Sequence, residues 1–393
     1  MTARVRAAAS WTALAELAVP LLTATLGFQL LRLMASTVIS VQRERLGVPL
    51  AGLGMFGLGV PLFGLLAPLI IRVLGLHASL WLSAGGTALV RLVLQLVPDA
   101  LARWLLAPLG VLCFLWFVPV YLRRAPGDRK RLGPALLAGL ALDTALFGLW
   151  GTWDYAWRFD LGGITVAVAL AAVQFAALAR VSSRGDPGTT ATAAGAAPLA
   201  GLGPALFLYA LAWQNIAWQT VFGRHSQAIA FALVMSANAA AIATAVLVTT
   251  SRRVPLRPGS TGGWVLTVVA VGGLLLATLL SRQLATVALL VGQVATAALV
   301  SGICLRASAE DRHGTPFASA TAWTLGMVGF FAALFLYYAG YDVVLPYDNQ
   351  TLLLVAAAAL AIAGVVAQRD SPIAFEPPPA RAWLPAAFGV VLL

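Results

Sequence analysis

Asp143 is the residue whose type and position point most directly to chemistry. It lies inside an apolar segment that begins at Pro134, and about 14 Å of helix separates the two residues at 1.5 Å per residue. At that depth in a membrane, a carboxylate costs several kcal/mol unless it is paired or protonated. Asp143 therefore binds a cation or proton, neutralises an arginine, or forms a structural ion pair that holds two helices together.

Two arginines inside apolar segments, Arg32 and Arg91, are the available partners for Asp143. Arg32 shares a helix face with Gln29, three residues earlier. Long basic side chains near helix ends can also extend to the lipid headgroups. We expect this of Arg91.

A second group of polar side chains lies in the apolar segment 202–222. Gln214 with Trp218, and Asn215 with Gln219, are four residues apart and so share helix faces. Amide groups beside tryptophan suit a sugar, a polar headgroup or another uncharged ligand. Hydrogen bonding between helices is the alternative, at roughly 0.6 kcal/mol per bond.

Aromatic and acidic residues alternate in two predicted outer turns. The members of this outer cluster are Trp150, Trp153, Asp154, Tyr338 and Asp342. Aromatic belts at the membrane surface account for such clusters in most membrane proteins. A docking surface for an extracytoplasmic domain or a lipid headgroup is the sharper alternative, and neither interpretation requires a metal.

Catalytic motifs are missing from the sequence. It contains no P-loop, no GxSxG and no HExxH, and its three histidines are scattered. We expect no cofactor and leave open whether the chain is part of an enzyme.

The composition predicts the kind of structure in which these polar residues lie. The chain has 393 residues, of which 61% are hydrophobic and 10% are charged, so an all-α polytopic membrane protein is expected. Runs of about 20 apolar residues, the length that crosses a bilayer, recur throughout. We predict twelve transmembrane helices, at residues 11–38, 48–71, 79–97, 104–122, 134–153, 161–178, 202–222, 227–248, 264–280, 284–304, 316–338 and 351–366.

Basic residues support this count. With the N-terminus inside, the inner loops hold about three times as many Arg and Lys residues as the outer loops. The inner loops then carry the whole net charge of +11, which argues against nucleic-acid binding. The domains expected are a six-helix half at residues 1–180, an inner linker at 181–201 and a second half at 202–368.

The remaining residues, 369–393, form a Pro-rich inner loop and a short apolar run. From Trp383 this run gives about 16 Å of helix, too little to cross a bilayer. We expect that the chain is truncated within a thirteenth helix that leads to the outer side.

The expected arrangement resembles that of the major facilitator superfamily, because it has two six-helix halves, both termini inside and an inner linker. The likeness is strongest in PLIIRVLGLHASLWLSAGGTALVRLVLQL, where a short basic loop with glycines precedes an Ala, Gly and Leu helix. It implies two halves that rock around a central cavity, lined by helix one, which favours Arg32 as the partner of Asp143. The family's acidic residue is missing from the loop around Arg72, which argues against proton coupling.

The stretches LALDTALFGLWGTWDYAWRFD and LYYAGYDVVLPYDNQ are similar to the membrane part of certain bacterial proteins. These proteins join facilitator-like helices to an extracytoplasmic endonuclease/exonuclease/phosphatase-type domain. The likeness implies that such a hydrolase domain follows Leu393 and is a partner of the helices.

The sequence therefore predicts a facilitator-like module in a bacterial inner membrane that transports a small polar or amphipathic solute. Its candidate solute site comprises Asp143, Arg32, Gln29, Gln214, Asn215, Trp218 and Gln219. Membrane lipid and a solute or lipid headgroup are the expected partners. The alternative function is the membrane anchor of a larger hydrolase.

Cysteine labelling tests the predicted topology. Single cysteines placed in the turns 123–131 and 342–348 should react with a membrane-impermeant maleimide from opposite sides of the membrane, because basic loops stay inside. Labelling of both turns from one side would contradict the twelve-helix arrangement.

Overall fold

The structure is a computed structural model in which part of the chain is described. The described residues are 14–31, 33–34, 60, 62–97, 100–124, 129–150, 161–182, 239–240, 242–243, 261–280, several positions between 284 and 299, and 358, 361 and 362.

The fold is all-helical, as predicted, and the described residues contain no strand. We call Leu14–Leu31 the N-terminal helix. The other elements are η1 (Phe63–Leu66), α3 (Ala67–Leu80), the π-helical turn η2 (Trp81–Gly85), α4 (Gly86–Leu96), α5 (Ala100–Arg124), α6 (Arg129–Trp150), α7 (Leu161–Ser182) and α11 (Thr261–Leu279).

Four described spans are long and apolar enough to cross a membrane: Leu14–Leu31, Phe63–Leu96, Leu105–Arg124 and Gly163–Val181. They match the predicted helices one to four and six. The predicted fifth and ninth correspond to α6 and α11. The seventh helix, with its polar face, and the eleventh lie outside the described residues, so the count of twelve stays a prediction.

Helix boundaries differ from the predicted ones where polar residues continue a helix. α6 begins at Arg129, five residues before the predicted start, because its basic first turn is helical although it is not apolar. α7 continues to Ser182, into the predicted linker. Hydropathy indicates where a helix leaves the lipid. The helix itself can continue beyond that point.

The predicted loop between the second and third helices is a sharp break at Gly75. The backbone of Gly75 has φ 77° and ψ 167°, a conformation that a residue with a Cβ rarely adopts. The Ser79 hydroxyl lies 2.6 Å from the carbonyl oxygen of Gly75 and so stabilises the turn. Phe63–Leu96 is therefore two helices joined at one glycine.

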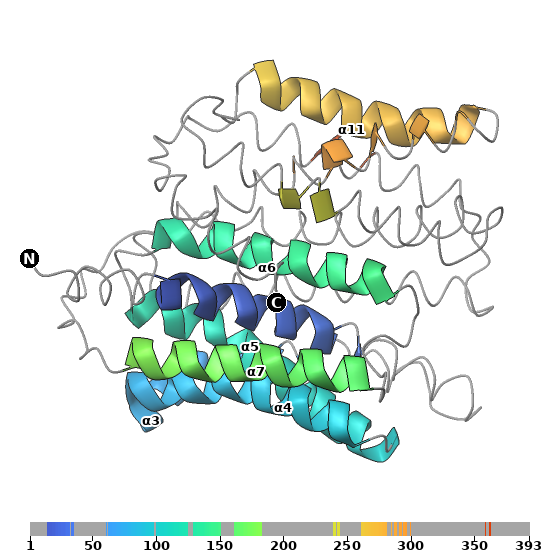
Figure 1. The fold of residues 1–393 in the computed structure, drawn as a ribbon. Coiled ribbons are helices and arrows are strands. Elements are labelled where there is room, and N and C mark those ends of the chain that lie inside the picture. The colour runs from blue at the N-terminus through green and yellow to red at the C-terminus, as the bar shows by residue number, and fades with distance from the viewer. Residues whose placement is uncertain are drawn as a thin grey trace, which may run out of the picture.

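The N-terminal helix and α5 form the interior of the first half. Of their membrane-length windows, 83% and 72% of the residues are buried, against 22% for Phe63–Leu96 and 33% for α7. Figure 1 shows the N-terminal helix in blue beside α6, with α5, α7, α3 and α4 on its other side and α11 at the opposite edge of the molecule. α4 packs on both α5 and α7.

Contacts along the N-terminal helix give the direction of its neighbours. Leu17 packs against Ala135 at the start of α6, and further along Thr25 contacts Gly139. These two helices are therefore parallel, as the predicted first and fifth helices should be.

α5 runs in the opposite direction. The hydroxyl of Tyr121, near its end, contacts Glu16 at the start of the N-terminal helix. Gly110, which is nearer the beginning of α5 than Tyr121 is, lies against Leu30 near the end of the N-terminal helix. This antiparallel pairing agrees with the alternation predicted for the first and fourth helices.

Close packing also joins α11 to the predicted tenth helix. A Cβ on Gly273 would lie 2.5 Å from the Cα of Gly292, so the two backbones touch directly. The neighbouring Gly272 has open space around it. Glycine is thus required on only one face of α11.

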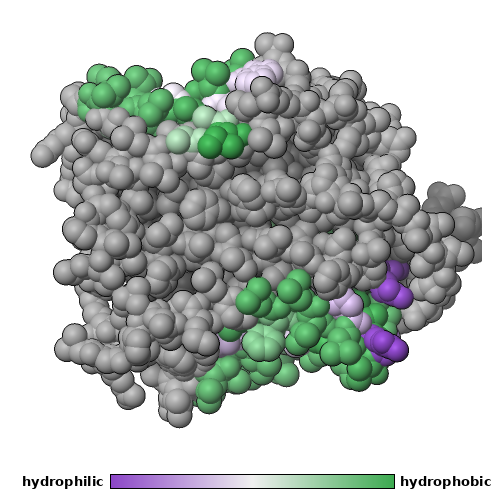
Figure 2. Space-filling model, turned by 180° about the vertical axis from the view of Figure 1, so that it is seen from behind, coloured by the Kyte–Doolittle hydropathy of each residue, from purple (hydrophilic) through white to green (hydrophobic). Residues whose placement is uncertain are grey.

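Large apolar side chains are exposed on several of the described helices. Figure 2 shows them in two areas at opposite edges of the molecule. They include Leu69 and Val73 of α3 and Val268 and Leu279 of α11. Such a surface is unsuited to water over this area and suits the hydrocarbon of a bilayer.

A proline interrupts the hydrogen bonds of the N-terminal helix. Pro20 has no N–H to donate to the carbonyl oxygen of Glu16, four residues earlier. The Tyr121 hydroxyl of α5 donates to that oxygen at 3.1 Å. A neighbouring helix therefore replaces the missing bond, as an apolar environment demands.

Replacing Tyr121 with Phe should lower the stability of the protein in detergent by about 1 kcal/mol, because it leaves the Glu16 carbonyl without this donor. In a Pro20→Ala background the same change should cost little, since an alanine at this position restores the backbone N–H. Thermal unfolding of the four variants measures this coupling. Equal losses in both backgrounds would contradict it.

Candidate functional site

Two of the predicted site residues lie buried in the first half. Asp143 on α6 is 0% exposed and Gln29 on the N-terminal helix is 3% exposed. The others lie outside the described residues: Arg32, Gln214, Asn215, Trp218, Gln219, Trp153, Asp154, Tyr338 and Asp342. The backbone of Trp150 ends α6, but its side chain is also outside the described part.

Arg91 does not extend to the headgroups, so that expectation is wrong. Its side chain is 5% exposed and points into the bundle from α4. Its Nε donates to Gln29 Oε1 at 2.8 Å, and its Nη1 donates to Gln95 Oε1 at 2.8 Å. Two amide oxygens thus replace part of the hydration that the guanidinium would find at the membrane surface.

The sequence held a signal for this arrangement that our prediction missed. Gln95 follows Arg91 by four residues, so the two side chains meet on one helix face. That face is the buried stripe of α4, which also contains Thr87 and Leu94. Gln95 itself is 0% exposed.

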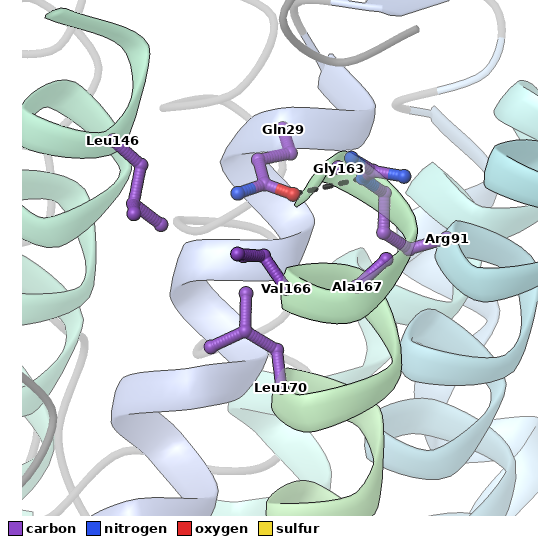
Figure 3. Close-up of a pocket in the computed structure, with 7 residues that line it drawn as sticks. All are labelled: Gln29, Arg91, Leu146, Gly163, Val166, Ala167 and Leu170. Carbon is purple, nitrogen blue, oxygen red and sulfur yellow. Dashed lines mark hydrogen bonds between the residues drawn. The ribbon is translucent and has the colours of Figure 1, made fainter. Parts of the chain in front are cut away.

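A small pocket adjoins this cluster. Its volume is about 20 Å³, room for about one water molecule, and its lining residues come from the N-terminal helix, α4, α6 and α7. We call it the Gln29 pocket. Its lining residues are Gln29, Arg91, Leu146, Gly163, Val166, Ala167 and Leu170 (Figure 3).

Asp143 lies close to this level of the bundle. On α6 it falls between Gly139, which contacts Thr25, and Leu146, which lines the Gln29 pocket. Because α6 and the N-terminal helix are parallel, Asp143 is level with the turn between Thr25 and Gln29. It is not among the residues that line the pocket.

A second polar contact joins the N-terminal helix to α7. Gln174 is 0% exposed, and its Nε2 donates to Thr23 Oγ1 at 2.6 Å. The Thr23 hydroxyl in turn donates to the carbonyl oxygen of Val19 at 2.7 Å. Among the described residues, Gln174 Oε1 has no hydrogen-bond partner. Our sequence analysis did not single out Gln174, because a single Gln in an apolar helix carries no spacing signal.

The first half also has a buried arginine at its opposite end. Arg124, the last residue of α5, is 6% exposed, and its Nη2 donates to the carbonyl oxygen of Val181 near the end of α7. A cation beside the last carbonyls of a helix is favourable, since those oxygens lack partners within the helix. We read Arg124 as holding two helix ends together.

The part of the chain that the structure describes contains no set of side chains that could bind a metal ion. No group of three or more His, Cys, Asp or Glu side chains gathers there. The site is therefore one of amides, hydroxyls, one guanidinium and one carboxylate among apolar side chains. Such groups suit non-covalent binding of a solute.

Comparison with known proteins identifies the fold. No family model matches the sequence, and no curated protein matches it. Among solved structures, the human organic anion transporter MFSD10 (TETRAN) is similar, with a TM-score of 0.55 and 16% sequence identity. The match covers 91% of this chain and 99% of the transporter chain.

The chain thus has the all-helical fold of this transporter, and four described spans are long and apolar enough to cross a membrane. Because the match extends over nearly the whole of the transporter, the predicted facilitator-like fold is confirmed. The twelve helices and their division into two halves stay predictions. At 16% identity, this similarity does not show which substrate the chain binds. The link to an endonuclease/exonuclease/phosphatase-type domain stays a prediction.

Proposed function

We propose that the chain transports a small polar or amphipathic solute across the membrane by rocking of two six-helix halves. Residues 1–180 and 202–368 form these halves in the proposal, joined by an inner linker, with the N-terminus in the bacterial cytoplasm. The fold supports it, because facilitator bundles expose a midplane site to each side in turn.

The single observation that carries the proposal is the complete burial of Asp143 in α6. A carboxylate inside a transmembrane helix is expensive and marks a solute or ion pathway by default. Next to it in the chain, the hydroxyl of Thr144 bonds within α6, to the carbonyl oxygen of Leu140 at 2.8 Å. Asp143 is therefore the acidic centre of the proposed pathway through the first half.

In this mechanism Asp143 has one of two roles. It binds a cation or the solute directly, or it neutralises Arg32 so that the helices can pack. The N-terminal helix, which carries Gln29 and directly precedes Arg32 in the sequence, is the mobile element in the proposal, since Pro20 weakens its backbone bonding. Tyr121 and Gln174 would hold that helix in place in the present state.

An organic solute is our first choice. The structurally similar MFSD10 is described as an organic anion transporter, and the buried guanidinium of Arg91 favours groups that accept hydrogen bonds. Membrane lipid surrounds the module in this proposal and supplies no chemistry.

Transport by the purified chain in liposomes tests the function. We expect accumulation of at least one solute from a panel of organic anions, sugars, amino acids and amines above that in empty liposomes. Absence of any protein-dependent flux in a correctly folded preparation would contradict the proposal.

Asp143→Asn separates the two roles of this residue. If Asp143 contacts the solute, the variant should lose transport by roughly 100-fold, and an added Arg32→Gln change should not restore it. Recovery in the double variant would instead assign a structural ion pair. Thr267→Val is the matched control, because it removes a buried hydroxyl whose bond stays within α11.

A further inference from the structure

The turn at Gly75 lies at the same level of the bundle as the end of α5. A Cβ on Gly86 would contact the Sγ of Cys113, and a Cβ on Gly110 would contact the side chain of Val90. Because the residue numbers fall along α5 as they rise along α4, the two helices are antiparallel. Gly75 precedes Gly86 by as many residues as the end of α5 follows Cys113. The turn and the end of α5 are therefore level.

Two more segments reach this end of the bundle. Arg124, the last residue of α5, donates to the carbonyl oxygen of Val181, near the end of α7. The Nε1 of Trp116 on α5 donates to the carbonyl oxygen of Phe63 at 2.9 Å, which places the helix before Gly75 beside α5. This helix runs from Phe63 to the turn, so it ends at the same level as α5 and α7.

Positive charge gathers at this end. Among the side chains that the structure describes, three arginines are exposed, and all three lie here. Arg72 lies directly before the turn, Arg123 lies at the end of α5, and Arg180 lies at the end of α7. Glu16, at the start of the N-terminal helix, is the one acidic side chain described at this end. A surface with this balance of charge attracts an anionic group.

The backbone around the turn adds to the attraction. A helix begins after Gly75, and its first N–H groups point to this end with the positive partial charge of the helix dipole. The space beside Gly75 is open, since a Cβ there would meet no atom within 4 Å. The ends of α5 and α7 carry the opposite partial charge. Arg124 offsets that charge where it donates to the Val181 carbonyl oxygen.

The surface that leads to Arg72 is apolar. Leu66, Leu69 and Val73 recur at intervals of three and four residues, so they share a face, and they are 41%, 54% and 71% exposed. From Leu62 to Val73 the helix is about 16 Å long at 1.5 Å per residue, which is close to half of the roughly 30 Å of hydrocarbon in a bilayer. Figure 2 shows strongly hydrophilic side chains at one end of the lower apolar area. An acyl chain along this face would bring its headgroup to Arg72.

We propose that an anionic phospholipid binds at the Arg72 corner, the surface formed by Arg72, Arg123 and the turn at Gly75. The two guanidinium groups donate to the phosphate, and an acyl chain contacts Leu69 and Val73. A free phosphate ion would use the arginines alone, whereas a lipid matches the charge and the apolar face together. Under the predicted topology this lipid belongs to the inner leaflet. The site goes beyond the proposed transport function, because its residues are exposed on the surface of the first half.

Native mass spectrometry of the full purified chain in neutral detergent tests this site. Dioleoylphosphatidylglycerol is the probe, and dioleoylphosphatidylcholine, which has the same acyl chains and no net charge, is its control. We expect one retained phosphatidylglycerol, with an affinity roughly tenfold or more above that of phosphatidylcholine. Equal retention of the two lipids, or retention of neither, would overturn the proposal.

Glycerol phosphate distinguishes a lipid site from a general anion site, because it carries a phosphate without acyl chains. An excess of this compound should leave the bound phosphatidylglycerol in place, as chloride of the same ionic strength does. Displacement by glycerol phosphate but not by chloride would assign the corner to a soluble phosphate compound and contradict a lipid ligand.

Arg72→Gln and Arg123→Gln should each lower the affinity for phosphatidylglycerol about fivefold, because each removes one basic group close to the headgroup. Both side chains are exposed, so the melting temperature should not change. Arg103→Gln is the matched control, since it removes the same charge near the opposite end of α5 and should leave the affinity unchanged.

An equal loss of affinity in Arg103→Gln would show that the net charge of the chain attracts the lipid, and it would overturn the Arg72 corner as a site. Full retention of phosphatidylglycerol by the double variant of Arg72 and Arg123 would also overturn it. These outcomes are distinct from that of the liposome assay, since lipid binding requires no flux.

Discussion

The structure of the first half depends on one constraint: within lipid, each polar group of the N-terminal helix must find its partner in the protein. Pro20 removes one backbone donor, and Tyr121 of α5 replaces it. Thr23 accepts a hydrogen bond from the side-chain amide of Gln174 on α7. Gln29 accepts one from the guanidinium of Arg91 on α4. Contacts to three different helices therefore fix both the rotation and the depth of this helix.

Close packing reinforces the same arrangement. A Cβ on Gly139 would lie 3.0 Å from the backbone nitrogen of Thr25 and still closer to the carbonyl oxygen of Leu21, so α6 touches the N-terminal helix along its backbone. On the other side, the ring of Phe114 covers Gly27 and lies 5.4 Å from the ring of Phe28. Small residues at such crossings are how membrane helices approach each other. The Gln29 pocket lies beside the contact between α6 and the N-terminal helix, at the level of Leu146.

The sequence predicted the helices better than it predicted their partners. Apolar runs located α5, α7 and α11 within a few residues, because length and hydropathy reflect the bilayer directly. Gly75 marked the turn between two helices. The start of α6 at Arg129 was missed, since a helix that continues into headgroups or water leaves no apolar signal.

The candidate site shows the same limit. Gln29 and Asp143 were predicted to belong to the solute site; both are buried, and their solute role stays a prediction. Arg91 was assigned to the headgroups because an arginine near a helix end has two favourable environments, and only tertiary contacts decide between them. Gln95, one helical turn away, was the readable clue. Gln174 could not be found, because its partner Thr23 is 151 residues away in the chain.

The central claim is that the N-terminal helix and α6 run parallel, so that Leu17 meets Ala135 and Gln29 meets Leu146 at one pocket. Disulfide cross-linking in membranes tests it directly, in a chain whose Cys113 and Cys304 are replaced by Ser. Leu17→Cys with Ala135→Cys should cross-link on mild oxidation, and Leu17→Cys with Leu146→Cys should not. Cross-linking of the second pair instead of the first would contradict the arrangement on which the site depends.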